Sequence, residues 1–391
     1  MDLVGIDAAT PRAAVAADGR SVLVWRDAPG PRLVASFGDA RGRFSAPLTV
    51  SRQAHQYAVA PGAIAYVTAD SIRVAVRDGR RLRSRWVASS IGSRNNGLAI
   101  AADPLGGWVV VEASSRRASG LSRIRVVSLD ARGRPVGRFQ ELGVGVFDSA
   151  ARQAQPLVVR PDGQAVLAFR RPAGRGHLTG PVMVAVRPHS GTFAPPVALP
   201  GNDKLADPRV TVADGVALVA ATAVTHCNES VCGGQPRASR VAADGTPGPL
   251  AGPSLNNPGR AFGPWAVEGA LVFQRKAGPD PFTLAASLRA VALRADGSVG
   301  ALQTLTRERA VEPVALPLVA RRTLVVWTSA EAFDAALAGR DGRFAATAAP
   351  TGPPPTASHF AETNRDAHAA GRYAIVAWSR SGVVRVSTRR F

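Results

Sequence analysis

The stretch AVAADGRSVLVWRDAPGPRLVASFGDARGRFSAPLTV, residues 14–50, contains the unit from which this chain is built. In it, an apolar run is followed by an Asp-Gly turn, a second apolar run that ends in Trp25, an alternating run, another turn and a last apolar run. Asp-Gly pairs between apolar runs are hairpin signals, because glycine tolerates positive φ. The unit therefore predicts four short strands, at residues 14–16, 21–25, 32–37 and 46–50.

This unit returns eight times, about every 50 residues, from one end of the chain to the other. Its second apolar runs are residues 21–25, 64–67, 107–111, 165–169, 216–219, 270–273, 323–327 and 374–378. One four-stranded unit cannot bury both of its faces, but units packed side by side around an axis cover each other. The sequence therefore predicts a single all-β domain over residues 1–391. Residues 332–339 come nearest to a helical pattern and are too few to change the fold class.

The last unit indicates how the ring closes. It ends at residues 383–387 without a fourth strand, whereas residues 3–6 precede the first inner strand and have no unit of their own. We expect residues 3–6 to pair with the eighth unit, because an open edge would leave backbone groups unpaired. This closure resembles that of β-propellers. The expected fold is an eight-bladed β-propeller, with seven blades and one irregular unit as the alternative.

Positive charge is large and is carried almost entirely by arginine. The net charge is +20, and Lys204 and Lys276 are the only lysines among 48 basic residues. Arginine binds carboxylates and phosphates in a bidentate fashion, so one interpretation is a surface for a polyanion, either nucleic acid or an anionic glycan. The other is a coding bias that replaces lysine throughout, which the spread of arginine over all eight units favours. The dense runs, residues 80–85 and 132–134, fall at expected hairpins, where charge is usually solvated.

Two cysteines lie close together in an otherwise cysteine-free chain. Cys227 and Cys232 fall within residues 225–236, which we expect to form a long polar loop of the fifth unit. Such a pair predicts a local disulfide and an oxidising compartment. A metal site that uses His226 is the weaker interpretation, because structural zinc needs about four ligands. The sequence shows no signal peptide and no apolar run of membrane-spanning length, so we expect a secreted, periplasmic or cell-surface protein whose leader is absent.

Candidate site residues come from their position in the repeat rather than from a motif. The chain lacks the sialidase-type Asp box, Trp-Asp repeats, calcium loops, a Gly-x-Ser-x-Gly elbow, a phosphate loop and a His-Glu-x-x-His helix. Residues just before each inner strand of a propeller converge on the axis, where a few polar groups can form a pocket. That position holds Arg12, Gln56, Asn96, Gln155, Asp207, Arg260, Glu312 and Asp366. The alternative is that these residues are polar because they lie in solvated turns.

Several side chains admit a functional and a packing interpretation. Tyr57 is the one tyrosine near the expected funnel, so a sialidase would need it as the nucleophile. His55 and His368 precede or enter inner strands and are either funnel residues or buried imidazoles. Trp25, Trp327 and Trp378 share one position in the repeat, which is typical of packing between units.

The sequence favours a non-enzymatic, exported, monomeric propeller without cofactor or metal. It would bind a protein or an anionic glycan through one face or through the central funnel, and nucleic acid is suggested by net charge alone. The alternative function is a carbohydrate-active hydrolase or lyase, in which Asp207, Glu312 and Asp366 supply an acid and a base or a cation site.

Overall fold

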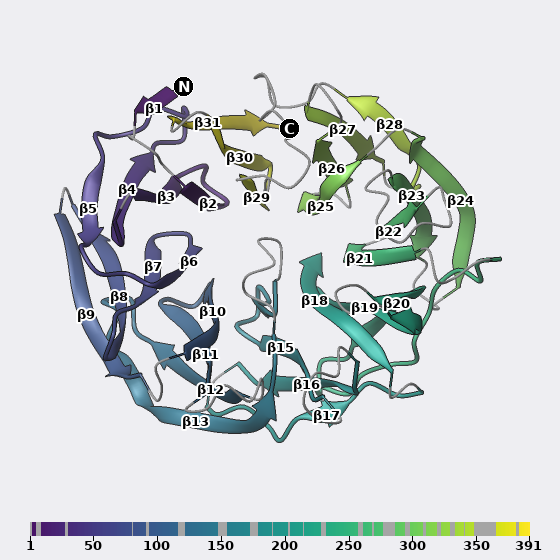
Figure 1. The fold of residues 1–391 in the computed structure, drawn as a ribbon, viewed down its shortest axis with the longest axis horizontal. Helices are drawn as coiled ribbons and strands as arrows, with labels where there is room; N and C mark the ends of the chain where they lie inside the picture. The colour runs from purple at the N-terminus through teal and green to yellow at the C-terminus, as the bar shows by residue number, and fades with distance from the viewer. Residues whose placement is uncertain are drawn as a thin grey trace.

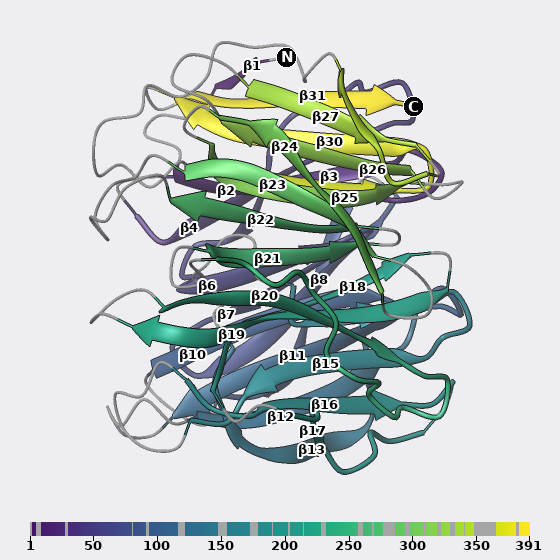
Figure 2. The same ribbon diagram turned by 90° about the vertical axis from the view of Figure 1, so that its right-hand side faces the viewer.

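Eight small antiparallel sheets form a ring around a central axis in the computed structural model (Figure 1). The structure describes residues 2–4, 9–27, 30–79, 81–90, 94–115, 122–147, 155–172, 179–189, 191–201, 204–213, 215–227, 232–256, 261–267, 270–276, 286–293, 298–307, 310–318, 322–328, 333–339, 341–347, 365–380 and 383–391. Side view and axial view together place the strands roughly along the axis (Figure 2). The described residues contain strands and no helix, and so no helix that could cross a membrane.

Each sheet is one blade; in blades 1 to 7 the strand numbers increase from the axis outwards, and in blade 8 the outermost strand is β1. Blade 1 consists of β2 (Ala9–Val15), β3 (Ser21–Asp27), β4 (Arg32–Gly38) and β5 (Leu48–Ser51). Blade 2 consists of β6 (Gln56–Ala60), β7 (Ala63–Val67), β8 (Ser71–Asp78) and β9 (Arg81–Ser89). Blade 3 consists of β10 (Arg94–Ala102), β11 (Trp108–Ser115), β12 (Ser122–Leu129) and β13 (Pro135–Gly145). Blade 4 consists of β14 (Leu157–Val159), β15 (Ala165–Arg170), β16 (Val182–Arg187) and β17 (Val197–Ala198).

The second half of the ring follows the same plan. Blade 5 has three named strands, β18 (Leu205–Ala213), β19 (Val216–Cys227) and β20 (Cys232–Val241). Blade 6 consists of β21 (Ala261–Val267), β22 (Ala270–Lys276), β23 (Ala286–Leu293) and β24 (Val299–Thr306). Blade 7 consists of β25 (Val311–Leu318), β26 (Arg322–Thr328), β27 (Phe333–Ala338) and β28 (Phe344–Thr347). Blade 8 consists of β29 (Arg365–Ala370), β30 (Tyr373–Arg380), β31 (Val383–Arg390) and β1 (Asp2–Val4).

The two ends of the chain meet in blade 8, as the sequence predicted. Strand β1 pairs antiparallel with β31, and Leu3 lies opposite Val384 in the register. The N-terminal strand thus covers an edge that would otherwise expose unpaired backbone groups. The eight-bladed fold and its closure are confirmed, and the seven-bladed alternative is excluded.

The core lies between the blades, where apolar faces of neighbouring sheets pack together. Trp25 is 1% exposed and packs with Ile375 and Val384 of blade 8. Trp378 of blade 8 meets Phe333 of blade 7 edge-on, with 5.2 Å between ring centroids. Packing between units therefore explains the repeated tryptophan position.

Residues 333–338 form strand β27, in agreement with the all-β prediction. Two local expectations were wrong. The first inner strand, β2, begins at Ala9, five residues before the expected Ala14. Cys227 and Cys232 do not lie in a long loop: they are the last residue of β19 and the first of β20 and stand opposite each other in the register. Continued pairing satisfies backbone groups that a loop would leave to water, which explains why the hairpin extends to the cysteines.

Candidate functional site

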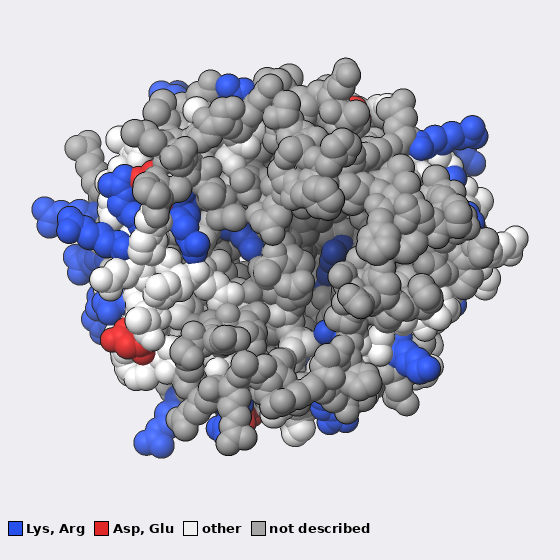
Figure 3. All heavy atoms as spheres, in the orientation of Figure 1, with Lys and Arg blue, Asp and Glu red and all other residues white. Residues whose placement is uncertain are grey.

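A cavity of about 340 Å³ lies on the axis of the ring. Every one of the eight inner strands, β2, β6, β10, β14, β18, β21, β25 and β29, contributes to its wall. A hollow with arginine or lysine side chains in it is visible at the centre of the space-filling view (Figure 3). Most of the lining is apolar, with alanine, valine, leucine, isoleucine and proline side chains from several blades. The cavity is thus large enough for a small ligand.

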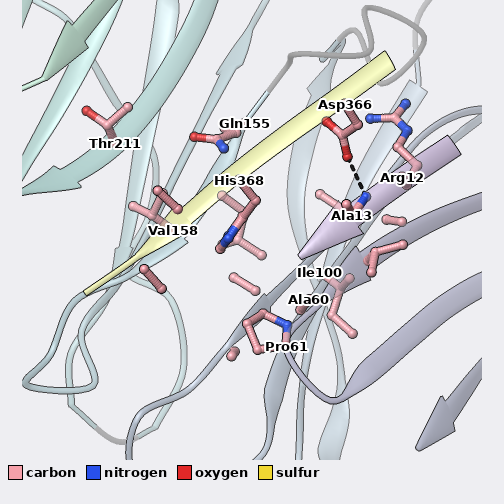
Figure 4. Close-up of a pocket in the computed structure, with 18 of the residues that line it drawn as sticks. Arg12, Ala13, Ala60, Pro61, Ile100, Gln155, Val158, Thr211, Asp366 and His368 are labelled. Atoms are coloured by element: carbon pink, nitrogen blue, oxygen red, sulfur yellow. Dashed lines mark hydrogen bonds between the residues drawn. The ribbon is translucent and has the colours of Figure 1, made fainter. Parts of the chain in front are cut away.

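Polar side chains interrupt this wall at a few places. The polar lining residues are Arg12, Gln155, Thr211, Asp366 and His368. Asp366 and His368 lie two residues apart on β29, so their side chains leave the strand on the same side. Arg12, on the neighbouring β2, points to the same region as Asp366 (Figure 4). Among the described residues, the charged groups of the cavity therefore lie where blade 8 meets blade 1.

The two side chains of β29 also join the innermost strands of these blades. Asp366 Oδ2 accepts a hydrogen bond from the backbone N–H of Ala13 at 2.9 Å, and His368 Nδ1 accepts one from Val15 at 3.3 Å. Both N–H groups belong to the edge of β2 that does not pair with β3, and alternate residues of a strand present their N–H groups to the same edge. The spacing of two residues on β29 thus matches the spacing of two residues on β2.

Burial changes the acidity of the Asp366 carboxyl. Desolvation of the charged form raises its pKa to about 6, although the positive charge of Arg12 and the N–H groups of Ala13 and Ala367 act in the opposite direction. Asp366 is therefore ionised at neutral pH and protonated in mild acid.

Burial acts on His368 in the opposite sense. Desolvation of the imidazolium lowers its pKa to about 4, so the ring is neutral over the physiological range. A backbone N–H can only donate, so Nδ1 must be the accepting, unprotonated nitrogen in the bond with Val15. The proton of the neutral ring is consequently on Nε2, which makes this nitrogen a donor.

On the opposite side of the ring, blades 5 and 6 add an aromatic wall that the sequence prediction missed. Trp265 of β21 lines the cavity and is 1% exposed. The guanidinium of Arg209, from β18, lies 4.1 Å from the Trp265 ring centroid and donates to the Gly263 carbonyl at 3.2 Å. A cation over an indole face is a favourable contact. The signal in the sequence was a tryptophan in an inner strand, outside the repeat position of the other buried tryptophans.

The eight residues predicted from the repeat have different outcomes. Arg12, Gln155 and Asp366 line the cavity, whereas Gln56 begins β6 without lining it. Asn96, Asp207 and Glu312 belong to inner strands, but their side chains lie outside the described set, and so does the whole of Arg260. Most of these positions are inside the inner strands rather than before them, because the strands begin earlier than expected. Of the three predicted carboxylates, only that of Asp366 is described.

The remaining candidates lie elsewhere. Tyr57 is 8% exposed and packs in the core between blades 1 and 2, so it cannot serve as a sialidase nucleophile in the cavity. His55 is exposed, and His368 is the histidine that lines the cavity. Among the described residues, no group of three His, Cys, Asp or Glu side chains is arranged to hold a metal ion.

Comparisons with known proteins show the fold. No family model matches the chain, and no curated protein matches it. A prolyl endopeptidase matches with a TM-score of 0.52 and 14% identity, over 88% of this chain and 50% of that one. A puromycin hydrolase mutant complexed with PGG matches with a TM-score of 0.50 and 17% identity, over 94% of this chain and 58% of that one. The chain thus spans only half to three fifths of these two proteins. An ulvan lyase matches over 100% of this chain with 10% identity and a TM-score of 0.49. At these identities, the similarity establishes a β-propeller and leaves activity to the site itself.

Proposed function

We propose that this protein is a non-enzymatic binding protein whose central cavity takes the acidic end of a glycan. The observation that carries the proposal is that Arg12, Asp366 and His368 lie together in a cavity whose other described lining residues are mostly apolar. Pockets for small ligands combine an apolar wall with a few convergent polar groups, and this cavity has that composition.

Each polar group has a role in binding a sugar acid. The Arg12 guanidinium pairs with the ligand carboxylate, for which its planar donors are suited. Protonated Asp366 donates a hydrogen bond to the same carboxylate, and His368 donates from Nε2 to a hydroxyl group. The apolar wall contacts the faces of the sugar ring.

The hydrogen bonds of the site favour binding over acid–base catalysis. His368 uses its basic nitrogen to accept the Val15 N–H, so it has no free lone pair with which to remove a proton. Asp366 is likewise held by the Ala13 N–H. Groups that are fixed in this way give a rigid, preorganised site, which reduces the cost of binding.

Titration calorimetry with galacturonate, and with galactose as the neutral analogue, tests this function. We expect galacturonate to bind about tenfold more tightly at about pH 5 than at about pH 7.5, because ionised Asp366 repels the ligand anion above its pKa. Arg12→Gln should weaken binding about tenfold or more at about pH 5. The matched control is Arg52→Gln, which removes an exposed arginine elsewhere on blade 1. Equal affinity of the Arg12 and Arg52 variants, or binding that does not change with pH, would contradict the proposal.

A second candidate function is favoured by the raised pKa of Asp366. General acids of carbohydrate-active enzymes need a carboxyl that keeps its proton near neutral pH. If the protein is a hydrolase or lyase, acidic polysaccharides incubated with it release new reducing ends or unsaturated uronates, and Asp366→Asn abolishes their release. Binding without any product supports the non-enzymatic function.

Export remains part of the proposal, and the cysteine pair supports it. The register places Cys227 opposite Cys232 across the β19–β20 hairpin, which suits a cross-strand disulfide. The side chains of both residues lie outside the described set, so the bond stays a prediction. We expect the intact mass of the unreduced protein to be about 2 Da lower than that of the reduced protein, the mass of two hydrogens lost in forming a disulfide. Equal masses would show free thiols and would remove this support for export.

A further inference from the structure

Arginine is concentrated on the outer strand of one blade. Strand β9 carries Arg81, Arg83 and Arg85, whereas the outer strands β5, β17, β24 and β28 contain no arginine. A coding bias alone does not explain why β9 has three arginines and β24, which is nearly as long, has none. The three arginines of β9 therefore indicate a local role for this strand.

The strands around β9 extend this positive surface over blades 2 and 3. Strands β8, β9, β12 and β13, with the turn at residues 130–134, carry the arginines Arg73, Arg77, Arg81, Arg83, Arg85, Arg123, Arg132, Arg134 and Arg138, in addition to Arg125, which is 13% exposed and pairs with buried Glu112. The acids of the same segments are Asp78, Asp130 and Glu141. In the axial view, basic side chains crowd the left-hand rim, where β5 and β9 lie (Figure 3). We call this surface the β9 rim.

An exposed tryptophan lies within the β9 rim. Trp86 is 56% exposed, and it is the one aromatic residue among the exposed large apolar side chains of the described chain. It stands opposite Arg73 in the register of β8 and β9, next to Arg85 in sequence. Side chains alternate along a strand, so Trp86 leaves β9 on the side of Arg73 and Ser84, whereas Arg81, Arg83 and Arg85 leave it on the other side. An indole left in water beside arginines is a feature of recognition surfaces, because tryptophan stacks on rings while arginine binds anions.

Hydrogen bonds hold the guanidinium groups of the β9 rim in place. Arg85 Nε donates to the Arg132 carbonyl at 3.0 Å, which joins blade 2 to blade 3. Arg73 Nε donates to Ser84 Oγ at 3.1 Å. Arg83 Nε lies 2.6 Å from Asp78 Oδ2, and both of these side chains are more than half exposed. A guanidinium has five donors, so a bond through Nε orients the group without exhausting it.

We propose that the β9 rim binds an acidic polysaccharide that lies across the outer edge of blade 2, with its carboxylate or sulfate groups on Arg81, Arg83 and Arg85 on one side of β9 and one sugar ring on Trp86 on the other side. Arg81, Arg83 and Arg85 alternate along an extended strand, so they leave it on one side about 7 Å apart. A row of cations at this spacing suits an extended chain that carries regularly repeated anions. Platforms for single-stranded nucleic acid stack successive bases on several aromatic side chains, whereas the exposed aromatic surface here suits a single ring. This site is separate from the cavity and does not depend on the function proposed for it.

Binding of polygalacturonate to the full chain tests the β9 rim, with neutral dextran and single-stranded poly(dT) as comparison polymers. Measurements at about pH 7.5 and about 0.15 M salt keep Asp366 ionised and the cavity unfavourable to anions. We expect Arg81→Gln/Arg83→Gln to weaken polygalacturonate binding about tenfold and to reduce the slope of log affinity against log salt by about 2. Trp86→Ala should weaken it about fivefold, and Trp86→Phe should restore most of the loss.

The control is Arg20→Gln/Arg43→Gln, which removes the same charge from two exposed, ion-paired arginines in the turns of blade 1. Binding by this control within about twofold of wild type supports the β9 rim, and so does unchanged polymer binding by Arg12→Gln. An equal loss in the two double variants would show that net charge alone attracts the polymer. Tighter, Trp86-dependent binding of poly(dT) would assign the surface to nucleic acid. Either result, or a failure of polygalacturonate to bind, overturns the proposal without affecting the galacturonate test of the cavity.

Discussion

Replacing Arg125 by methionine lowers the free energy of unfolding by about 3–5 kcal/mol at neutral pH. The cause is Glu112 of β11, whose side chain is completely buried and whose carboxylate pairs with the Arg125 guanidinium, with Nε 2.9 Å from Oε2. Arg125 is itself 13% exposed. Removal of one member of a buried pair leaves the other charge in a medium that solvates it poorly.

Arg125 also joins two blades. Its guanidinium lies 5.0 Å from the centroid of the Phe139 ring on β13 and donates to the Ser89 carbonyl on β9 at 3.3 Å. Burial raises the pKa of Glu112, and Arg125 opposes that rise, so the pKa increases further in the variant. A raised folded-state pKa gives stability that is present in acid and lost as pH rises. The deficit of Arg125→Met should therefore shrink as pH falls and Glu112 takes up a proton.

Urea unfolding of a double-mutant cycle measures the pair. Glu112→Leu/Arg125→Met removes both charges, so it should recover most of the stability that Arg125→Met loses. Arg123→Met is the matched control, because Arg123 is 60% exposed and its ion pair with Glu141 is 3.4 Å long. We expect this control to lose less than about 1 kcal/mol. A similarly small loss in Arg125→Met, or additive effects in the cycle, would show that Glu112 does not depend on Arg125.

The fold could be predicted because the evidence for it is repeated. Eight copies of one hairpin pattern give eight independent indications of the same blade, and an error at one turn leaves the count intact. The closure followed from a missing strand at one end and an unassigned strand at the other, and β1 pairs with β31 as expected. Local boundaries were less predictable, since pairing extended β19 and β20 beyond their apolar runs to Cys227 and Cys232.

The cavity could be predicted only in part, because a repeat position fixes the blade of a residue but not the direction of its side chain. Arg12, Gln155 and Asp366 line the cavity, yet Gln56 at the same nominal position does not. The bonds from β29 to Ala13 and Val15 join residues 353 positions apart, and no local pattern reveals such a pairing.

The bonds between β29 and β2 lead to the second large effect, a pair of opposite pH dependences. Burial raises the pKa of Asp366 to about 6 and lowers that of His368 to about 4. The stability from Asp366 is fully present below the pKa of about 4 that it has in the unfolded chain, and is lost as pH rises through 6. The stability from neutral His368 is present above about pH 6.5 and is lost as pH falls towards 4. In the wild type, these two contributions oppose each other between about pH 4 and 6.5.

Single substitutions separate the two contributions. Asp366→Asn and His368→Gln each keep an oxygen that can accept the backbone N–H of β2, so they remove the titration with little change to the contact. Relative to wild type, Asp366→Asn should gain stability as pH rises from about 4 to 6, and His368→Gln should gain it as pH falls from about 6.5 to 4. One displaced proton gives a slope of at most about 1.4 kcal/mol per pH unit, so each change amounts to about 2–3 kcal/mol across its window.

Urea unfolding of wild type and both variants at closely spaced pH values measures these slopes, and Arg12→Gln tests their cause. The Arg12 charge holds the pKa of Asp366 below the value that burial alone would give it. Without the Arg12 charge, Asp366 loses its proton at a higher pH. In the Arg12→Gln background, the stability that Asp366→Asn gains relative to Asp366 should therefore develop at a higher pH than in the wild-type background. Because the pKa of Asp366 is higher in Arg12→Gln, the pH range in which Asp366 is protonated and does not repel an anionic ligand should also move upward in this variant. Slopes of the same sign in the two variants, or differences from wild type that do not change with pH, would mean that these side chains titrate as they do in water.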